Sequence, residues 1–139
     1  MIMDKSNYLV ITPTFNEIEN IDLFIKKILD LHLDILIVDD NSPDGTGKFV
    51  NKKKEQFKNL YLLSLESKQG LGSAYRMGFD WAIDKDYEYV IQMDADFSHK
   101  PEELKKNIKK FKNLKLDLLI SSRYLKDSRI YNWSIQRRL

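Results

Sequence analysis

Short apolar runs that alternate with helical segments most constrain the fold of this chain. The runs are apolar throughout rather than at every second position, which is typical of parallel strands buried on both faces. We expect strands at about residues 8–12, 34–40, 60–65, 87–93 and 116–120. Apolar periodicity and turn-rich starts predict helices between them, at about residues 17–31, 46–58, 73–84 and from 101 onward. This order predicts an α/β domain with a mainly parallel sheet and right-handed crossovers.

The residues after the first run predict where its strand stops and where a helix begins. Pro13 has no backbone N–H to donate to a neighbouring strand, so we expect pairing to end there. Asn16 is then suited to cap the first helix, with Glu17 in its first turn, where the helix dipole favours negative charge.

Length and composition are typical of one soluble globular domain, which we expect to span residues 1–139. The net charge is only +2, but residues 100–139 hold 12 Lys and Arg against 4 Asp and Glu. This imbalance suggests an anionic partner, although a solvated helix face explains the lysines between 105 and 115 better. Nucleic acid is the least favoured partner, because the basic residues lack regularly interleaved aromatics. The absence of cysteine excludes disulfides and thiolate metal sites.

Polar clusters follow four of the predicted strands, at residues 12–17, 39–44, 94–98 and 121–123. In open parallel sheets, ligands bind outside the carboxyl ends of the strands. Because those ends lie on one edge of a parallel sheet, we expect the four clusters to meet there. The sequence therefore predicts a nucleotide-type binding site at this edge.

Asp94 and Asp96 are the sharpest of these polar signals. In an extended backbone, residues two apart point the same way, so both carboxylates face one spot. Two like charges held that close are stabilised by a divalent cation, and all-oxygen ligands favour Mg²⁺ or Mn²⁺ over zinc. An Asp-rich turn after a strand is the alternative interpretation.

Two further segments allow both a structural and a functional interpretation. Asp39 and Asp40 end a buried strand, where one of them is suited to a nucleotide. The alternative is turn formation by Asp39 and Asp40 and helix capping by Asp44. Gly70 and Gly72 resemble part of a phosphate-binding loop, but the full G-x-G-x-x-G spacing is missing. Helix–strand packing explains these glycines better. A Walker A sequence is absent, which argues against a P-loop nucleotide hydrolase.

Arginines lie near the predicted site or close the chain. Arg123 follows the fifth predicted strand, where an arginine can hold a phosphate with two parallel hydrogen bonds. Arg137 and Arg138 end the chain near Trp133, and a frayed basic tail is the alternative interpretation for both.

Taken in order, these segments resemble the polyprenol monophosphomannose synthases, the dolichyl-phosphate mannosyltransferases of the family 2 glycosyltransferases. The Asp-Asp and Asp-x-Asp pairs alone indicate only family 2, whereas residues 42–46 and 94–99 are far more specific. The resemblance covers nearly the whole chain and is carried by residues 13–17 (PTFNE), 38–46 (VDDNSPDGT), 70–75 (GLGSAY), 93–99 (MDADFSH), 122–124 (SRY) and 132–139 (NWSIQRRL).

The resemblance implies a GT-A fold, a GDP-mannose donor, a polyprenyl phosphate acceptor and a bound Mg²⁺ or Mn²⁺. It implies that the metal and diphosphate are held by Asp94, Ala95 and Asp96, with Ser98 as a further metal contact of shorter reach than the glutamine of some members. The nucleotide pocket would be lined by Pro13, Phe15 (commonly Tyr in the family), Glu17, Val38 and Asp40. Arg123 and Arg137 match arginines that neutralise the donor and acceptor phosphates, and with Asp96 they form the implied catalytic set.

This resemblance also fixes the expected chemistry and setting. An acceptor phosphate is already anionic near neutral pH, so inversion at the anomeric carbon needs no strong general base. Asp127 is the sole candidate base after Arg123, which favours a phosphate acceptor over a sugar hydroxyl. We expect a cytoplasmic protein, peripheral to the membrane face, because no early apolar run forms a signal peptide and no stretch is long enough to span a bilayer.

The alternatives left open by the sequence concern the donor and the chain's completeness. The family's catalytic domain continues past the segment that ends at Leu139, so we expect a truncated product or a fragment. One alternative is transfer of glucose or another sugar to undecaprenyl phosphate. The other is a nucleotide-binding piece without activity.

Overall fold

The computed structural model describes residues 6–122 and contains a four-stranded, fully parallel sheet. The strands are β1 (Tyr8–Thr14), β2 (Asp34–Asp39), β3 (Leu60–Ser64) and β4 (Tyr89–Gln92), and their order across the sheet is β3-β2-β1-β4. The helices are α1 (Ile21–Leu29), α2 (Thr46–Lys53), α3 (Leu71–Asp84) and α4 (Leu104–Asn113), with the short 3₁₀ helices η1 (Lys54–Gln56) and η2 (Pro101–Glu103). Two compact units divide the described residues, one ending at Leu104 and one beginning at Lys105.

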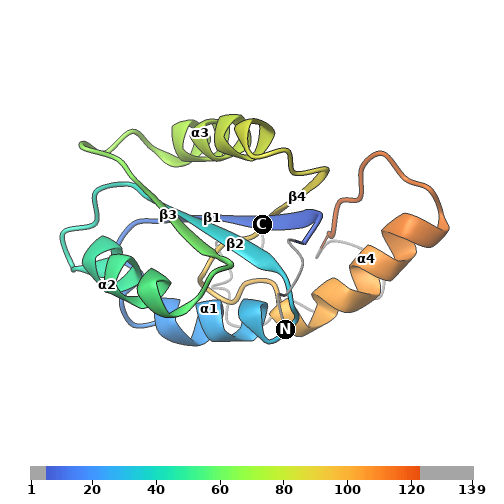
Figure 1. Cartoon of the computed structure of the whole chain (residues 1–139), viewed down its shortest axis with the longest axis horizontal. Coiled ribbons are helices and arrows are strands. Elements are labelled where there is room, and N and C mark those ends of the chain that lie inside the picture. Colours follow the sequence, from blue (N-terminus) through green and yellow to red (C-terminus); the bar gives the residue numbers. More distant parts are fainter. Residues whose placement is uncertain (1–5, 123–139) are drawn as a thin grey trace, which may run out of the picture. The chain divides into compact units, whose positions relative to one another are not determined.

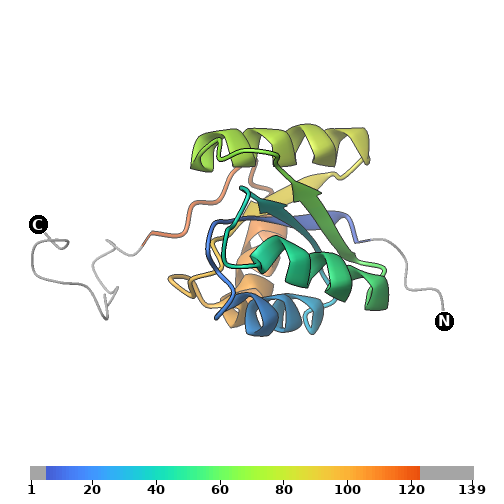
Figure 2. The ribbon, with the colours of Figure 1, turned by 90° about the vertical axis from the view of Figure 1, so that its left-hand side faces the viewer.

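Helices cover both faces of this sheet. Figures 1 and 2 show α3 on one face, with α1 and α2 on the other. Side chains alternate between the faces along each strand, which is why β1 and β2 each contain a run of consecutive apolar residues and are buried at nearly every position. The α/β domain with a parallel sheet predicted from the sequence pattern is therefore confirmed, because a strand with two covered faces needs apolar residues at successive positions.

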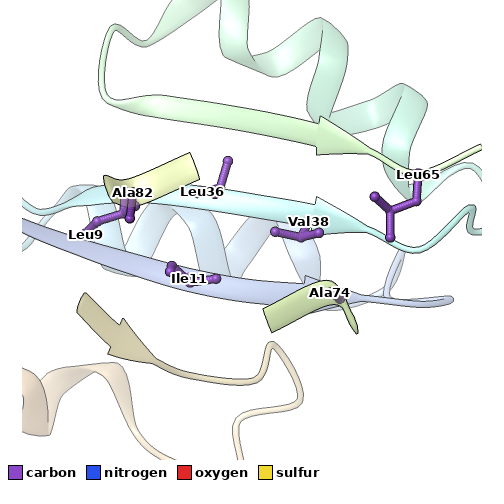
Figure 3. Close-up of a cluster of buried hydrophobic side chains, with 7 residues drawn as sticks. All are labelled: Leu9, Ile11, Leu36, Val38, Leu65, Ala74 and Ala82. Carbon is purple, nitrogen blue, oxygen red and sulfur yellow. The ribbon is translucent and has the colours of Figure 1, made fainter. Parts of the chain in front are cut away.

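The core beneath α3 is built from both central strands and the small residues of the helix (Figure 3). Its fully buried members are Leu9, Ile11, Leu36, Val38, Leu65, Ala74 and Ala82. Gly78 of α3 lets the helix approach β1, since a Cβ on Gly78 would lie 2.6 Å from Cγ2 of Ile11. Gly78, rather than Gly70 or Gly72, is thus the glycine on which helix–strand packing depends.

Pro13 does not end the first strand, contrary to the sequence prediction. β1 continues to Thr14, with Pro13 opposite Val38 and Thr14 opposite Asp39 of β2. On the other side, pairing with β4 stops at Ile11, whose carbonyl accepts from the N–H of Met93. Main-chain groups of alternate residues point to the same side, so the missing N–H of Pro13 faces the side where β4 has already ended.

The first helix begins later than predicted, and Asn16 does not cap it. Asn16 has a positive φ of 58°, and its N–H donates to Oγ of Ser42 instead. Helix α1 begins at Ile21 after a turn in which the carbonyl of Glu17 accepts from the N–H groups of Asn20 and Ile21. Glu17 is thereby placed in a loop at the sheet edge rather than in a helix.

The fifth predicted strand, at residues 116–120, is wrong. Within the described residues this segment pairs with no strand, and Leu118 and Ile120 are 72% and 76% exposed. An apolar run becomes a strand only when a sheet edge accepts its hydrogen bonds, and periodicity does not report that neighbour.

None of the helices in residues 6–122 has the length and apolar character needed to cross a membrane.

Candidate functional site

The loops that follow β1 and β2 are tied together at the carboxyl edge of the sheet. Main-chain N–H groups of the first loop donate to side chains of the second, so each loop fixes the other's course. The bonds run from Asn16 to Ser42 Oγ (3.0 Å), from Glu17 to Thr46 Oγ1 (3.1 Å) and from Ile18 to Asp44 Oδ2 (3.0 Å). Two of the clusters predicted from sequence therefore do meet.

Asp39 points toward the face that carries α2. Its Oδ1 accepts from the hydroxyls of Thr14 (2.7 Å) and Ser42 (2.6 Å), and its Oδ2 accepts from the N–H of Ser42 (3.0 Å). A Cβ on Gly47 would lie 2.7 Å from this Oδ2, so glycine is needed for α2 to begin so close. Buried at 4% exposure, Asp39 is thus a structural anchor for the turn between β2 and α2.

Asp40 points toward the opposite face, as the next residue in an extended segment must. Its Oδ1 and Oδ2 accept from the N–H groups of Gln69 (2.6 Å) and Gly70 (2.8 Å), just before α3. Gly70 has a φ of 92°, which glycine adopts without strain, whereas a Cβ on Gly72 would meet nothing within 4 Å. The packing role predicted for these two glycines is wrong, because Gly70 shapes the loop that Asp40 holds.

Asp44, for which helix capping was the structural alternative, precedes Gly45, the N-cap position of α2, and its side chain binds the first residue of that helix. Its Oδ1 accepts from the N–H (2.9 Å) and hydroxyl (2.5 Å) of Thr46, the first residue of α2. Desolvation is the largest single influence on the pKa of Asp44 and raises it, but the hydrogen bonds from Thr46, Ile18 and its own N–H together outweigh desolvation, so the pKa is lowered. The turn between β2 and α2 is thus stabilised by two aspartates, Asp39 and Asp44.

Asp94 and Asp96 lie just beyond β4, with both side chains exposed and Ala95 between them buried. The N–H of Ser98 donates to Oδ1 of Asp96 at 2.9 Å, which keeps Ser98 beside the pair. Its role as a metal contact stays a prediction. Phe97 has a φ of 57° and sets its ring edge-on against buried Phe24 of α1, with ring centres 5.8 Å apart. This apolar contact holds the loop while its carboxylates face outward.

The charge on this pair extends to Glu17, the residue placed at the same edge by the first loop. Partial burial raises the pKa of Glu17 above 4.5, and the negative charges of Asp96, Asp44 and Asp94 raise it further, against a hydrogen bond from Asn20 that lowers it. Carboxylates of the loops after β1, β2 and β4 are therefore close enough to repel one another. Such a concentration of like charge favours a bound cation.

Tyr75 of α3 is a site residue that lies in the motif at residues 70–75, but the sequence assigned it no role. Its hydroxyl donates to Oδ1 of Asp94 at 2.9 Å, and its ring packs against the core beneath α3. Burial, followed by the charge and hydrogen bond of Asp94, raises the pKa of Tyr75, so the hydroxyl keeps its proton. No sequence signal indicated the aspartate that its hydroxyl reaches, because the two residues lie on different elements, 19 positions apart.

The arrangement of Asp94 and Asp96 fits a hard divalent cation that takes its remaining ligands from substrate. Within residues 6–122, no group of three or more His, Cys, Asp and Glu side chains is placed to hold a metal. Magnesium sites often use one or two carboxylates plus substrate phosphates, and an exposed pair leaves room for them. Both side chains offer oxygen ligands only, which favours Mg²⁺ or Mn²⁺ over zinc.

The other predicted pocket residues surround this edge in different ways. Phe15 is exposed, and the ammonium of Lys68 lies 3.8 Å from its ring centre, a cation–π contact that sequence spacing does not indicate. Pro13 is half-buried in β1. The side chains of Val38 and Ala95 are buried, so any ligand contact at these two positions would use their main chain.

The predicted fourth cluster does not follow a strand within the described residues. Ser121 and Ser122 follow the unpaired segment, and the side chain of Ser121 accepts from Nδ2 of Asn107 (3.2 Å) in α4. Arg123 and Arg137, both predicted to bind phosphates, lie outside the described residues, as does Arg138. Their roles stay predictions.

A family model for glycosyl transferase family 2 matches residues 9–139. The chain belongs to this family. It is 37% identical over 133 residues to an undecaprenyl-phosphate mannosyltransferase of Micrococcus luteus, covering 94% of this chain and 54% of that protein. It is 39% identical over 132 residues to a polyprenol monophosphomannose synthase of Mycolicibacterium smegmatis, covering 93% and 49%. The resemblance inferred from the motifs is thus confirmed, and the family 2 chain spans about half the length of these relatives.

A solved structure supports the same assignment through its fold. The family 2 chain is similar to a mannosyltransferase from Pyrobaculum calidifontis in complex with GDP-Man and Mn²⁺, with a TM-score of 0.65 and 25% sequence identity. The similarity covers 77% of this chain and 32% of that one. Together with the parallel sheet and its two helical layers, it confirms the predicted α/β GT-A fold.

Proposed function

We propose that this chain is the nucleotide-sugar-binding part of an inverting mannosyltransferase that uses GDP-mannose and a polyprenyl phosphate acceptor. The observation that carries the proposal is the pair of exposed carboxylates, Asp94 and Asp96, directly beyond β4 at the carboxyl edge of the sheet, the edge at which the Glu17 loop is tied to the loop after β2. Relatives named as mannosyltransferases of polyprenyl phosphates support the substrates. A GDP-Man complex of a similar fold supports the donor.

In the proposed reaction, an oxygen of the acceptor phosphate forms a bond to the anomeric carbon while the bond to GDP breaks. A Mg²⁺ or Mn²⁺ ion held by Asp94 and Asp96 would supply positive charge for the departing diphosphate. Asp96 also keeps its loop in place through the N–H of Ser98. Arg123 and Arg137 would offset the charge of two anions brought together, so both count as proposed catalytic residues with Asp96.

The nucleotide is proposed to lie over the loops after β1 and β2, lined by Pro13, Phe15, Glu17 and the main chain of Val38. Asp40 would contribute less directly than the sequence implied, because both of its oxygens already accept main-chain hydrogen bonds. Because the acceptor is a lipid phosphate, we propose that the enzyme works at the cytoplasmic surface of a membrane.

Two measurements on the 139-residue chain test this proposal. The first is calorimetric titration with GDP in the presence of Mn²⁺, comparing the unaltered chain with Asp94→Asn. We expect binding by the unaltered chain and a loss of about 10-fold or more in the variant, since the remaining carboxylate alone holds the cation poorly. Equal affinities for GDP and Mn²⁺ in both proteins would contradict the metal assignment.

The second measurement is sugar transfer to a short polyprenyl phosphate, with GDP-mannose and UDP-glucose compared as donors. We expect faster transfer from GDP-mannose and a product of inverted anomeric configuration. Faster transfer from UDP-glucose would favour the alternative donor. GDP binding without transfer from either donor would indicate a nucleotide-binding piece that lacks activity by itself.

A further inference from the structure

The hydroxyl of Tyr75 makes the one side-chain hydrogen bond to Asp94 that is seen among the described residues. It donates to Oδ1 at 2.9 Å, across from α3 to the loop after β4. Asp94 is otherwise exposed, and an exposed carboxylate rotates freely about its last torsion. One bond to Oδ1 from a fixed donor restricts this rotation and leaves Oδ2 open.

Tyr75 is itself fixed by its surroundings. Its ring packs on the core beneath α3 and stacks near Phe79, with ring centres 6.2 Å apart. The donor therefore sits on a rigid helix rather than on a loop. A donor held in this way positions a metal ligand more accurately than a second loop residue would.

The beginning of the same helix is held by Asp40. Its two oxygens accept from Gln69 and Gly70, directly before the first residue of α3. The residue after β2 thus holds the start of α3 by hydrogen bonds, and Tyr75 of the same helix donates to the carboxylate beyond β4. This continuous path ties the nucleotide side of the edge to its metal side.

We propose that Tyr75 is a positioning residue for the divalent cation, acting through Asp94. This role rests on the proposed cation at Asp94 and Asp96, because the protonated hydroxyl of Tyr75 donates to Asp94 and is not itself proposed to bind the metal. By fixing Oδ1, the hydroxyl leaves Oδ2 in a single orientation and lowers the ordering entropy lost when the cation binds. Partners of this kind typically contribute about 10- to 100-fold in metal affinity.

The test is a Mn²⁺ titration of the 139-residue chain in saturating GDP, followed by the EPR signal of free Mn²⁺. Tyr75→Phe keeps the ring and its packing while removing the hydroxyl. We expect its affinity for Mn²⁺ to fall about 10-fold or more, with unchanged affinity for GDP in the absence of metal. Circular dichroism verifies that the variant is folded.

Tyr87→Phe is the matched control. Tyr87 also donates to an aspartate, Oδ2 of Asp34 (2.6 Å), but Asp34 is buried at the start of β2, the opposite edge of the sheet. We expect this variant to lower the urea midpoint while leaving Mn²⁺ affinity unchanged. If Tyr75 had only a structural role, Tyr75→Phe would behave like this control: the urea midpoint would fall and the Mn²⁺ affinity would stay unchanged.

The outcomes separate this proposal from the function on which it rests. Mn²⁺ binding of equal strength by the unaltered chain and Tyr75→Phe, with weak binding by Asp94→Asn, would overturn the role of Tyr75 alone. No Mn²⁺ binding by the unaltered chain would overturn the cation site and the role together. An equal loss of affinity in Tyr75→Phe and Tyr87→Phe would also refute it, since only a general loosening of the fold explains that result.

Discussion

Replacing Gly78 with alanine is expected to force α3 away from the sheet that it covers. A Cβ at this position would lie 2.6 Å from Cγ2 of Ile11 and 3.4 Å from Cγ2 of Val38. Carbon atoms in contact settle at about 3.5–4.0 Å, so the new methyl group is about 1 Å too close to Ile11. Ile11 is fully buried in β1, an interior strand, and has little freedom to move.

Two opposing terms set the size of the effect. Overpacking of a dense core costs about 1–3 kcal/mol, and the rigid neighbour places Gly78→Ala toward the upper end. Alanine is a better helix former than glycine by about 1 kcal/mol, which offsets part of that cost. We expect the free energy of unfolding to fall by about 1–2 kcal/mol.

Gly72→Ala, on the same helix, is the control that isolates the clash. A Cβ at Gly72 meets nothing within 4 Å, so only the gain in helix propensity remains. We expect this variant to be more stable than the unaltered chain by about 0.5–1 kcal/mol, with lower conformational entropy in the unfolded state as the cause.

Urea denaturation followed by tryptophan fluorescence measures both changes, provided that the slope of the transition is the same in all three proteins. The expected result is a lower midpoint for Gly78→Ala and a higher midpoint for Gly72→Ala. Shifts in the same direction would refute the assignment of Gly78 as the contact glycine of α3. Because α3 carries Tyr75, Gly78→Ala should also weaken Mn²⁺ binding, whereas Gly72→Ala should not.

Two more substitutions test the loops at the carboxyl edge. Asp40→Asn leaves one oxygen for the N–H groups of Gln69 and Gly70, so we expect a loss of about 1–3 kcal/mol in stability and faster hydrogen exchange at both amides; unchanged exchange would contradict the anchoring role. Glu17→Gln tests the cost of ionising a carboxylate that is partly buried and lies near other negative charges. The folded pKa of Glu17 lies above the unfolded 4.5, so its ionisation destabilises the fold as pH rises through the folded pKa. The variant should therefore be more stable than the unaltered chain at neutral pH, with the difference vanishing well below pH 4.5; a difference independent of pH would show that ionisation of Glu17 is not the cause.

Local pattern determined the elements that build the sheet. The strands predicted at residues 8–12, 34–40, 60–65 and 87–93 all exist. The interior strands β1 and β2 are buried on both faces, which demands the continuous apolar runs that the sequence displays directly, whereas the edge strands β3 and β4 are only partly buried. The same logic brought Glu17, Asp40 and Asp94 to one edge, since parallel strands end together. The strand predicted at residues 116–120 was wrong because an apolar run does not indicate whether a sheet edge is available to pair with it.

Only the tertiary structure decided what each polar side chain contacts. Sequence placed Asp39 and Asp40 at a strand end, but alternation and packing turned one toward the start of α2 and the other toward the start of α3. Tyr75 lies in a segment that carries the family resemblance, but its hydrogen bond to Asp94 joins a helix to a strand end, and these two elements are close only in the folded chain. Periodicity reports which face a residue occupies, whereas a hydrogen bond depends on distances of a fraction of an ångström between segments far apart in sequence.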